Sequence, residues 1–287
     1  MKFGVVIPNY GKGASRENIL ATMQAAEELG FHSVWLTDHI ALPEVQVGRF
    51  ANLYESTTTM AFLAGNCKRI RLGISTLVLP QRNPLEIAKK IATLDALSNG
   101  RVMLSVGVGW SMCEYQNLGY DFHNRGKRMD EAIQVLRLFW KGESAISFHG
   151  KHYTFENVSV SPLTYQKNGP PIWIAGDSPI AIQRAVRLGD GWHPNSRPLS
   201  QFVQEIQHMR ELDAVRNITI AMRFRVNFHK LPSDQRPLYG NATKLVHQLH
   251  AYQQSGLSYG IVHFEGESVK NCVRMMRKFS QEVQLSV

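Results

Sequence analysis

Residues 69–110 read RIRLGISTLVLPQRNPLEIAKKIATLDALSNGRVMLSVGVGW, and this stretch decides the fold. It begins with an apolar strand pattern over 71–79. Asn83-Pro84 then opens a helix, with Asn as the cap and Pro in the first turn, and Asn99-Gly100 ends it. A second strand over 102–108 is apolar nearly throughout, which is typical of a strand covered on both faces. The stretch therefore predicts a strand–helix–strand unit of a parallel sheet.

The same alternation of short apolar runs with helical spacing continues in both directions. A hairpin pattern over about 146–160 interrupts it and is interpreted as an insertion. Eight such units in 287 residues fit one (β/α)8 TIM barrel spanning 1–287, with insertions at the C-terminal ends of the strands. A doubly wound open sheet is the alternative, but it usually has fewer strands and a glycine-rich turn after the first one. The predicted strands cover 3–8, 33–37, 71–79, 102–108, 171–175, 191–194, 218–228 and 259–264.

Composition limits the compartment and the partners. Cys67, Cys113 and Cys272 are too scattered for a disulfide framework, and no signal-peptide pattern is present, so we expect a cytoplasmic protein. The net charge of +9 is compatible with an acidic partner or with a basic surface of no specific role. No apolar run is long enough to span a bilayer, and no nucleic-acid-binding signature occurs. We therefore expect a small-molecule substrate, and neither nucleic acid nor membrane as a partner.

Barrel enzymes carry their chemistry at the C-terminal ends of the strands, so the residues that close each strand are the candidates. The first strand ends in Asn9 and Tyr10 and lacks the His-x-His pair of barrel metallohydrolases. No predicted strand ends in the lysine that a Schiff-base aldolase requires, and no Gly-x-Ser-x-Gly elbow supplies a nucleophilic serine. The strand ends therefore point away from these three chemistries, and we expect no metal site.

The turn Gly176-Asp177-Ser178-Pro179 joins a predicted strand to a predicted helix. Glycine permits a close approach of the backbone, and the free N–H groups at a helix start attract phosphate, so this turn is a candidate phosphate site. The same residues are equally compatible with a helix that is simply capped by Asp177 or Ser178. Gly107-Val108-Gly109 does not continue into a dinucleotide motif, because Met112 takes the place of the third glycine.

Asp38 and His39 place a carboxylate beside an imidazole at the end of the second strand. Such a histidine can relay protons, although the pair is also compatible with a structural role. Arg223 and Arg225 alternate with apolar residues and share one face of the seventh strand. If that face is interior, each needs an anion, which is either Asp38 or Glu114 in an ion-pair network or the phosphate of a ligand.

Three blocks of the sequence resemble the bacterial luciferase-like monooxygenase family, in its branch of flavin- and coenzyme F420-dependent oxidoreductases. They are SVWLTDH at 33–39, the stretch at 69–110 quoted above, and GPPIWIAGDSPIAIQRAVRLGDGWHPN at 169–195. The resemblance implies a barrel, usually a homodimer, with the ring of a flavin or deazaflavin in its mouth. It also implies a frequent cis peptide bond in a bulge behind the ring. Its implied site residues are His39 and Asp38 for catalysis, and Asp38, Ser75, Thr76, Gly107, Trp110, Gly176, Asp177, Ser178, Trp192 and Asn195 for cofactor binding.

One position departs from the family pattern. Sugar-phosphate dehydrogenases of the family carry a catalytic glutamate where Trp110 stands, which puts their substrate and mechanism in doubt here, and Glu114 lies four residues further on. We expect an oxidoreductase that uses reduced deazaflavin (coenzyme F420) to transfer hydride to a small organic substrate. The alternatives are an FMN-dependent monooxygenase and a non-catalytic flavin-binding protein. The loops at 40–55, 110–124 and 228–240 are expected to wall the substrate pocket, and Phe50, Tyr54, Trp110 and Tyr115 favour an apolar substrate.

Overall fold

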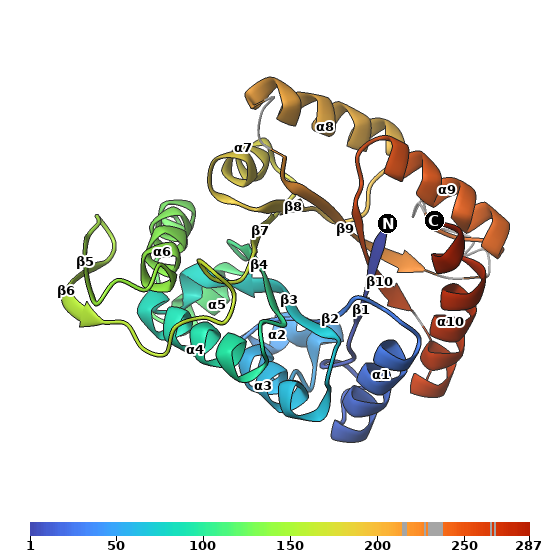
Figure 1. Cartoon of the computed structure of the whole chain (residues 1–287), viewed down its shortest axis with the longest axis horizontal. Coiled ribbons are helices and arrows are strands. Elements are labelled where there is room, and N and C mark those ends of the chain that lie inside the picture. The colour runs from blue at the N-terminus through green and yellow to red at the C-terminus, as the bar shows by residue number, and fades with distance from the viewer. Residues whose placement is uncertain (214–216, 227, 229–237, 265, 267) are drawn as a thin grey trace.

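The structure is a computed structural model that describes residues 1–287 except 214–216, 227, 229–237, 265 and 267. Within these residues, eight parallel strands close into a barrel in the order β1-β10-β9-β8-β7-β4-β3-β2 (Figure 1). The predicted (β/α)8 barrel is therefore confirmed. The barrel strands are β1 Lys2–Val6, β2 Ser33–Leu36, β3 Arg71–Val78, β4 Val102–Gly107, β7 Ile172–Ala175, β8 Gly191–His193, β9 Thr219–Val226 and β10 Tyr259–Phe264.

Helices follow the strands and form a layer around the barrel (Figure 1). The longer ones are α1 Arg16–Glu28, α3 Ser56–Asn66, α4 Pro84–Leu97, α6 Arg125–Trp140, α7 Pro179–Leu188, α8 Leu199–Leu212, α9 Ala242–Gln254 and α10 Val269–Glu282. The shorter ones are α2 Glu44–Val47 and α5 Met112–Asn117, with 3-10 turns at Gly48–Phe50, Leu79–Gln81 and Gln284–Ser286. None of the helices in the described ranges is both long and apolar enough to cross a membrane.

The hairpin expected over about 146–160 consists of β5 Ala145–His149 and β6 Thr154–Ser159, which pair antiparallel. Figure 1 shows it at the outer edge of the molecule beside α6, away from the barrel axis. The hairpin therefore adds to the helical layer without interrupting the order of the barrel strands.

Helix α4 shows how the sequence sets the boundaries of an element. The side chain of Asn83 accepts a hydrogen bond from the N–H of Leu85 at 2.9 Å, and Pro84 occupies the first turn, where an N–H has no intrahelical partner. Ile87 and Ile91 lie one turn apart on its inner face and are buried in the core between helices and strands. The cap that the sequence predicted is present, and an apolar stripe faces the core.

The interior of the barrel is filled by large aromatic side chains. Trp35 of β2 stacks on Trp173 of β7 with ring centroids 5.2 Å apart, and Tyr259 of β10 packs edge-on against Trp173 at 4.9 Å. Gly4 and Gly73 make room for Trp35, because a Cβ atom at either position would lie 2.4 Å from its side chain. The interior is therefore a packed core, and space for a ligand has to come from the ends of the strands.

Candidate functional site

A cavity of about 620 Å³ opens at the C-terminal ends of the barrel strands. Its volume falls in the range of roughly 300–1,000 Å³ that is typical of cofactor and substrate pockets. Asp177, Ser178 and Trp192 do not line the cavity and lie beside Gly176 at its edge. The other predicted site residues all line it, namely Asp38, His39, Ser75, Thr76, Gly107, Trp110, Gly176 and Asn195.

His39 and Glu114 form a hydrogen-bonded pair at the cavity wall. Nδ1 of His39, just after β2, lies 2.9 Å from Oε2 of Glu114 in α5. The other carboxylate oxygen accepts hydrogen bonds from the N–H groups of Ile40 at 2.7 Å and Ala41 at 3.1 Å. Burial opposes ionisation of Glu114, but the bonds from His39 and from the two backbone N–H groups hold its pKa down to about 2.

The ionised Glu114 fixes the tautomer of the histidine. A carboxylate can only accept hydrogen bonds, so Nδ1 of His39 carries the proton between them. In the neutral ring Nε2 then carries no proton, and His39 lines the cavity. Nε2 is therefore the ring nitrogen of His39 that remains to exchange a proton with a ligand.

Asp38, the neighbour of His39, is buried and engaged by protein groups. Arg82 and the hydroxyl of Ser56 both donate hydrogen bonds to Oδ1 at 2.7 Å. The N–H of Val78, at the end of β3, donates to Oδ2 at 2.9 Å. Because the side chain of Arg82 is also buried, the pair compensates two buried charges and ties the end of β2 to the end of β3. This geometry suits the positioning of strand ends better than proton transfer.

The end of β3 is irregular where it meets the cavity. The peptide bond between Ser75 and Thr76 is cis, as the family resemblance implies, and the pairing of β3 with β4 shifts register between Ile74 and Leu77. Neighbouring residues of a regular strand point to opposite faces, whereas Ser75 and Thr76 both line the cavity. Opposite them, Gly107 of β4 has no room for a side chain, since its Cβ would lie 2.7 Å from Cγ2 of Thr76.

The turn after β7 brings a helix start to the edge of the cavity. Gly176 has φ +138°, and a Cβ there would lie 2.8 Å from that of Ala181, so a larger residue does not fit. The side chain of Ser178 caps α7 by accepting a hydrogen bond from the N–H of Ala181 at 3.3 Å. The turn therefore combines a close backbone approach with a capped helix of 10 residues.

Asp177 and Trp192 hold this turn in place. Asp177 accepts hydrogen bonds from the N–H and the Nδ2 of Asn195, at 3.0 and 2.9 Å, and from Arg197. Burial opposes its ionisation, but these bonds and the charge of Arg197 keep its pKa below the usual range. Trp192 donates from Nε1 to the carbonyl of Gly176 at 3.0 Å. Its ring packs on α8, so Trp192 supports the turn from the helical layer and does not face the cavity.

Arg223 and Arg225 of β9 both line the cavity, as their alternation predicted. Arg223 donates hydrogen bonds to the carbonyl of Ser75 at 3.3 Å and to the hydroxyl of Tyr10 at 3.4 Å. The two carboxylates weighed as partners for these arginines are engaged by other residues, as described above. Arg223 therefore links the bulge of β3 to the loop after β1.

The loops expected to wall a substrate pocket contribute unevenly. Phe50 and Trp110 line the cavity. Tyr115 is buried instead and donates a hydrogen bond to the carbonyl of Val108 at 2.6 Å, so it supports the strand end from behind. Most of the third loop, at 228–240, cannot be placed, because residues 229–237 lie outside the described part of the chain. Asn227, just before this loop, also lies outside it.

Two hydrogen-bonded pairs of the site, Asp38 with Arg82 and His39 with Glu114, are not predicted by the sequence. The sequence does not indicate Arg82 as the partner of Asp38. It marks Glu114 as a possible anion for the arginines and as the carboxylate nearest to Trp110, but not as the partner of His39. His193 closes β8, and the sequence assigns it no role. It lies in the barrel interior with Nδ1 2.8 Å from the hydroxyl of Ser105, and burial lowers its pKa to about 3 with a contribution from Arg223. Strand alternation could have placed His193 inward, but no local signal marks the two pairs.

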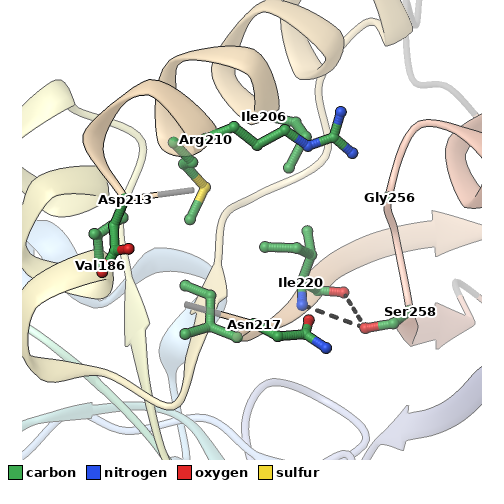
Figure 2. A pocket seen from close by; sticks show the side chains of 10 residues that line it. Val186, Ile206, Arg210, Asp213, Asn217, Ile220, Gly256 and Ser258 are labelled. Carbon is green, nitrogen blue, oxygen red and sulfur yellow. Dashed lines mark hydrogen bonds between the residues drawn. The ribbon is translucent and has the colours of Figure 1, made fainter. Parts of the chain in front are cut away.

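Another cavity, of about 360 Å³, lies at the N-terminal ends of β9 and β10 (Figure 2). Ile206 and Arg210 of α8 reach toward it, and the hydroxyl of Ser258 is within hydrogen-bond distance of both the N–H (3.3 Å) and the carbonyl (3.2 Å) of Ile220. TIM-barrel enzymes place their active sites at the C-terminal face, whereas the N-terminal face serves stability. The candidate functional site is therefore the cavity at the C-terminal ends.

Comparison with known proteins places this site in a family. The model of the luciferase-like monooxygenase family matches residues 1–236. The oxygenase component of a flavin-dependent trigonelline monooxygenase from Acinetobacter baylyi is 29% identical over 175 residues, which cover 60% of this chain and 46% of that protein. An F420-dependent glucose-6-phosphate dehydrogenase from Nocardia farcinica is 36% identical over 172 residues, covering 58% of this chain and 49% of that protein. The chain spans about half the length of these curated relatives.

The solved structures extend the likeness to the whole fold. The crystal structure of the monooxygenase RslO1 from Streptomyces bottropensis matches with a TM-score of 0.84 over 99% of both chains, at 20% identity. The residues that line the cavity, from Tyr10 to Arg225, all fall within the range matched by the family model. The resemblance seen in the three sequence blocks is thereby confirmed, and the chain belongs to the luciferase-like monooxygenase family.

Proposed function

We propose that the chain is an oxidoreductase that uses reduced deazaflavin (coenzyme F420) to transfer hydride to a small organic substrate. The observation that carries this proposal is the His39–Glu114 pair, because it engages Nδ1 and leaves Nε2 as the nitrogen through which an imidazole of the cavity lining can exchange a proton. The same cavity is bordered by the bulge of β3 and by the turn before α7.

The residues of the cavity fit a flat ring with a phosphate-bearing side chain. Gly107, Gly176 and the backbone around Ser75-Thr76 leave part of the wall without bulky side chains, where a ring can lie against the strand ends. The N–H groups at the start of α7, next to Ser178, are the natural site for the phosphate. Asn195 also lines the cavity and is held by Asp177.

The protein residues have distinct roles in this proposal. When bound, the reduced deazaflavin supplies a hydride. His39 carries the accompanying proton at Nε2, because Glu114 occupies its Nδ1. Asp38 acts as a positioning residue through its hydrogen bonds rather than as an acid or base. Phe50 and Trp110 pack around the imidazole, with ring centroids 4.6 and 5.6 Å from it, and limit its contact with water.

The relatives support two different cofactors. The Nocardia farcinica relative is named as F420-dependent and the Acinetobacter baylyi relative as flavin-dependent. We favour the deazaflavin, because a net charge of +9 suits its anionic polyglutamate tail. An FMN-dependent monooxygenase is the second candidate, favoured by the Acinetobacter baylyi relative.

Cofactor binding tests the proposal. The purified chain is titrated with F420 and with FMN, and each affinity is read from the absorption and fluorescence of the cofactor. We expect F420 to bind with a micromolar or lower Kd and FMN to bind about tenfold more weakly, a difference of about 1.4 kcal/mol. If FMN alone binds, the FMN-dependent monooxygenase replaces the F420-dependent oxidoreductase as the favoured function. Binding of neither would refute both, and binding without turnover over a broad substrate panel would identify a non-catalytic flavin-binding protein.

The cytoplasmic location and the homodimer expected from the sequence stay predictions. Size-exclusion chromatography with light scattering would measure the oligomeric state of the full chain.

A further inference from the structure

Four aromatic rings form a continuous surface in the cavity. The ring centroid of Phe50 lies 4.6 Å from that of His39, 5.5 Å from that of Tyr10 and 6.5 Å from that of Trp110. The rings of His39 and Trp110 are 5.6 Å apart. All four residues line the cavity, and we call them the aromatic wall.

Hydrogen bonds to α5 hold the segment after β2, which carries His39 and Phe50 of the aromatic wall. Besides the bonds of Glu114 described above, Nδ2 of Asn117 donates to the carbonyl of Ala41 at 2.9 Å. The hydroxyl of Ser111, at the start of α5, donates to Oε1 of Gln46 in α2. The connection after β2 is therefore tied to α5 at several points. A ligand that packs on the wall does not have to order it first, which lowers the entropic cost of binding.

Trp110 leaves a large apolar surface open at the cavity. Its side chain is 53% exposed, whereas the other four tryptophans are at most 3% exposed. Ile40 and Met112, close to the wall in the chain, are 43% and 42% exposed. Covering a rigid aromatic surface of this kind with an apolar ligand is favourable. The aromatic wall therefore favours a ligand with an apolar body.

We infer that the substrate is an uncharged, hydrophobic carbonyl compound or alcohol, with its apolar body on Phe50 and Trp110 and its oxygen at Nε2 of His39. This inference rests on the proposed function. In the reducing direction the carbonyl carbon accepts the hydride and the oxygen accepts the proton of His39, so the substrate becomes an alcohol and the deazaflavin is left oxidised. His39 regains its proton from solvent. The opposing reading is that Arg223 and Arg225, in the same cavity, select an anionic substrate.

A matched pair of probes separates the two readings. The pair is 1-phenylethanol and mandelate, in which a carboxylate replaces the methyl group. The full chain, loaded with oxidised cofactor, is labelled with 5-fluorotryptophan, and the 19F NMR signal of Trp110 is assigned with Trp110→Phe. We expect 1-phenylethanol to move this signal saturably, at a half-saturating concentration about tenfold below that of mandelate. The signals of the four buried tryptophans should stay in place and report an intact fold.

Two variants locate the binding surface. Phe50→Ala should raise the half-saturating concentration of 1-phenylethanol about tenfold, because the probe loses half of its apolar platform. Tyr165→Ala removes an aromatic ring that is 66% exposed but does not line the cavity, and should leave the value within about twofold.

The outcomes for the inference and for the proposed function are distinct. Mandelate binding as tightly as 1-phenylethanol, or a Trp110 signal that does not move while the cofactor spectrum shows full loading, would overturn the inference. Failure of the cofactor to bind contradicts the proposed function instead, and the same titration on the cofactor-free chain then decides whether the aromatic wall selects uncharged ligands.

Discussion

The carboxylate of Glu114 offers the sharpest single perturbation of the site. Its pKa of about 2 compares with an ordinary value of 4.5. One pKa unit corresponds to about 1.36 kcal/mol, so the ionised side chain contributes about 3 kcal/mol to the free energy of unfolding at neutral pH. Glu114→Gln keeps the shape and can still accept hydrogen bonds from Ile40 and Ala41, but it removes the charge. We therefore expect the free energy of unfolding of Glu114→Gln to be about 3 kcal/mol lower than that of wild type at pH 7.

The pH dependence identifies the charge as the cause. A carboxyl group with a lowered pKa stabilises the fold above its unfolded pKa, and that contribution disappears as the pH falls through the folded pKa. The difference between wild type and Glu114→Gln should be constant above pH 4.5 and fall to about half by pH 3. Urea unfolding followed by circular dichroism at pH 7 and at pH 3 measures this difference. A difference below about 1 kcal/mol at pH 7 would refute the reasoning.

The same variant tests the tautomer of His39. The side-chain amide that Glu114→Gln introduces can donate where the carboxylate only accepted, so Nδ1 can become an acceptor and the proton can move to Nε2. The matched control is Glu27→Gln, because Glu27 also accepts backbone N–H groups, those of residues 68–70, but binds no histidine. 15N NMR of the imidazole nitrogens should show the change in Glu114→Gln and not in the control.

Two further predictions concern the barrel interior. Gly73→Val puts a Cβ 2.4 Å from Trp35 and should lower the free energy of unfolding, measured with urea, by about 3 kcal/mol. Gly65→Ala, in a helix with open space around it, should raise the free energy of unfolding by about 0.5–1 kcal/mol. Equal effects of the two substitutions would contradict the packing argument. His193 has a pKa of about 3 against an ordinary 6.5, so the unfolded chain binds a proton below pH 6.5 that the folded chain does not, and stability falls as the pH falls. When the pH is lowered from 7 to 5, the free energy of unfolding of His193→Gln should fall by about 2 kcal/mol less than that of wild type. Equal losses would refute this prediction.

The fold could be predicted because its signals are local. A strand covered on both faces is apolar nearly throughout, which marks β4 in the sequence, and helix α4 carries its own cap at Asn83. The short helices α2 and α5 were not predicted. Their positions depend on contacts between distant segments, such as the one between Ser111 and Gln46, and no local periodicity records them.

The site could be predicted only where its residues are neighbours in the chain. Asp38 and His39 mark the end of one strand, but their partners Arg82 and Glu114 lie 44 and 75 residues away and meet them only when the barrel closes. Trp192 was expected to bind the cofactor, yet it occupies the middle of a three-residue strand whose neighbours point inward, so alternation directs it to the helical layer.

In the proposed function, the cavity at the C-terminal mouth holds a flavin-type cofactor with its phosphate at the start of α7. Ser178→Asp tests this central claim most directly. Aspartate is as good a helix cap as serine, so the fold should be kept, but its charge opposes a phosphate at the same N–H groups. Ser15→Asp makes the same change at the cap of α1, outside the cavity lining, and is the matched control.

The measurement is the Kd of the cofactor for wild type and for these two variants. A repulsion of about 2 kcal/mol, as expected for close charges near a protein surface, corresponds to a loss of about 30-fold for Ser178→Asp. The Ser15→Asp variant should stay within about twofold of wild type. If Ser178→Asp binds the cofactor as tightly as wild type does, the phosphate does not lie at α7 and the placement of the cofactor is wrong.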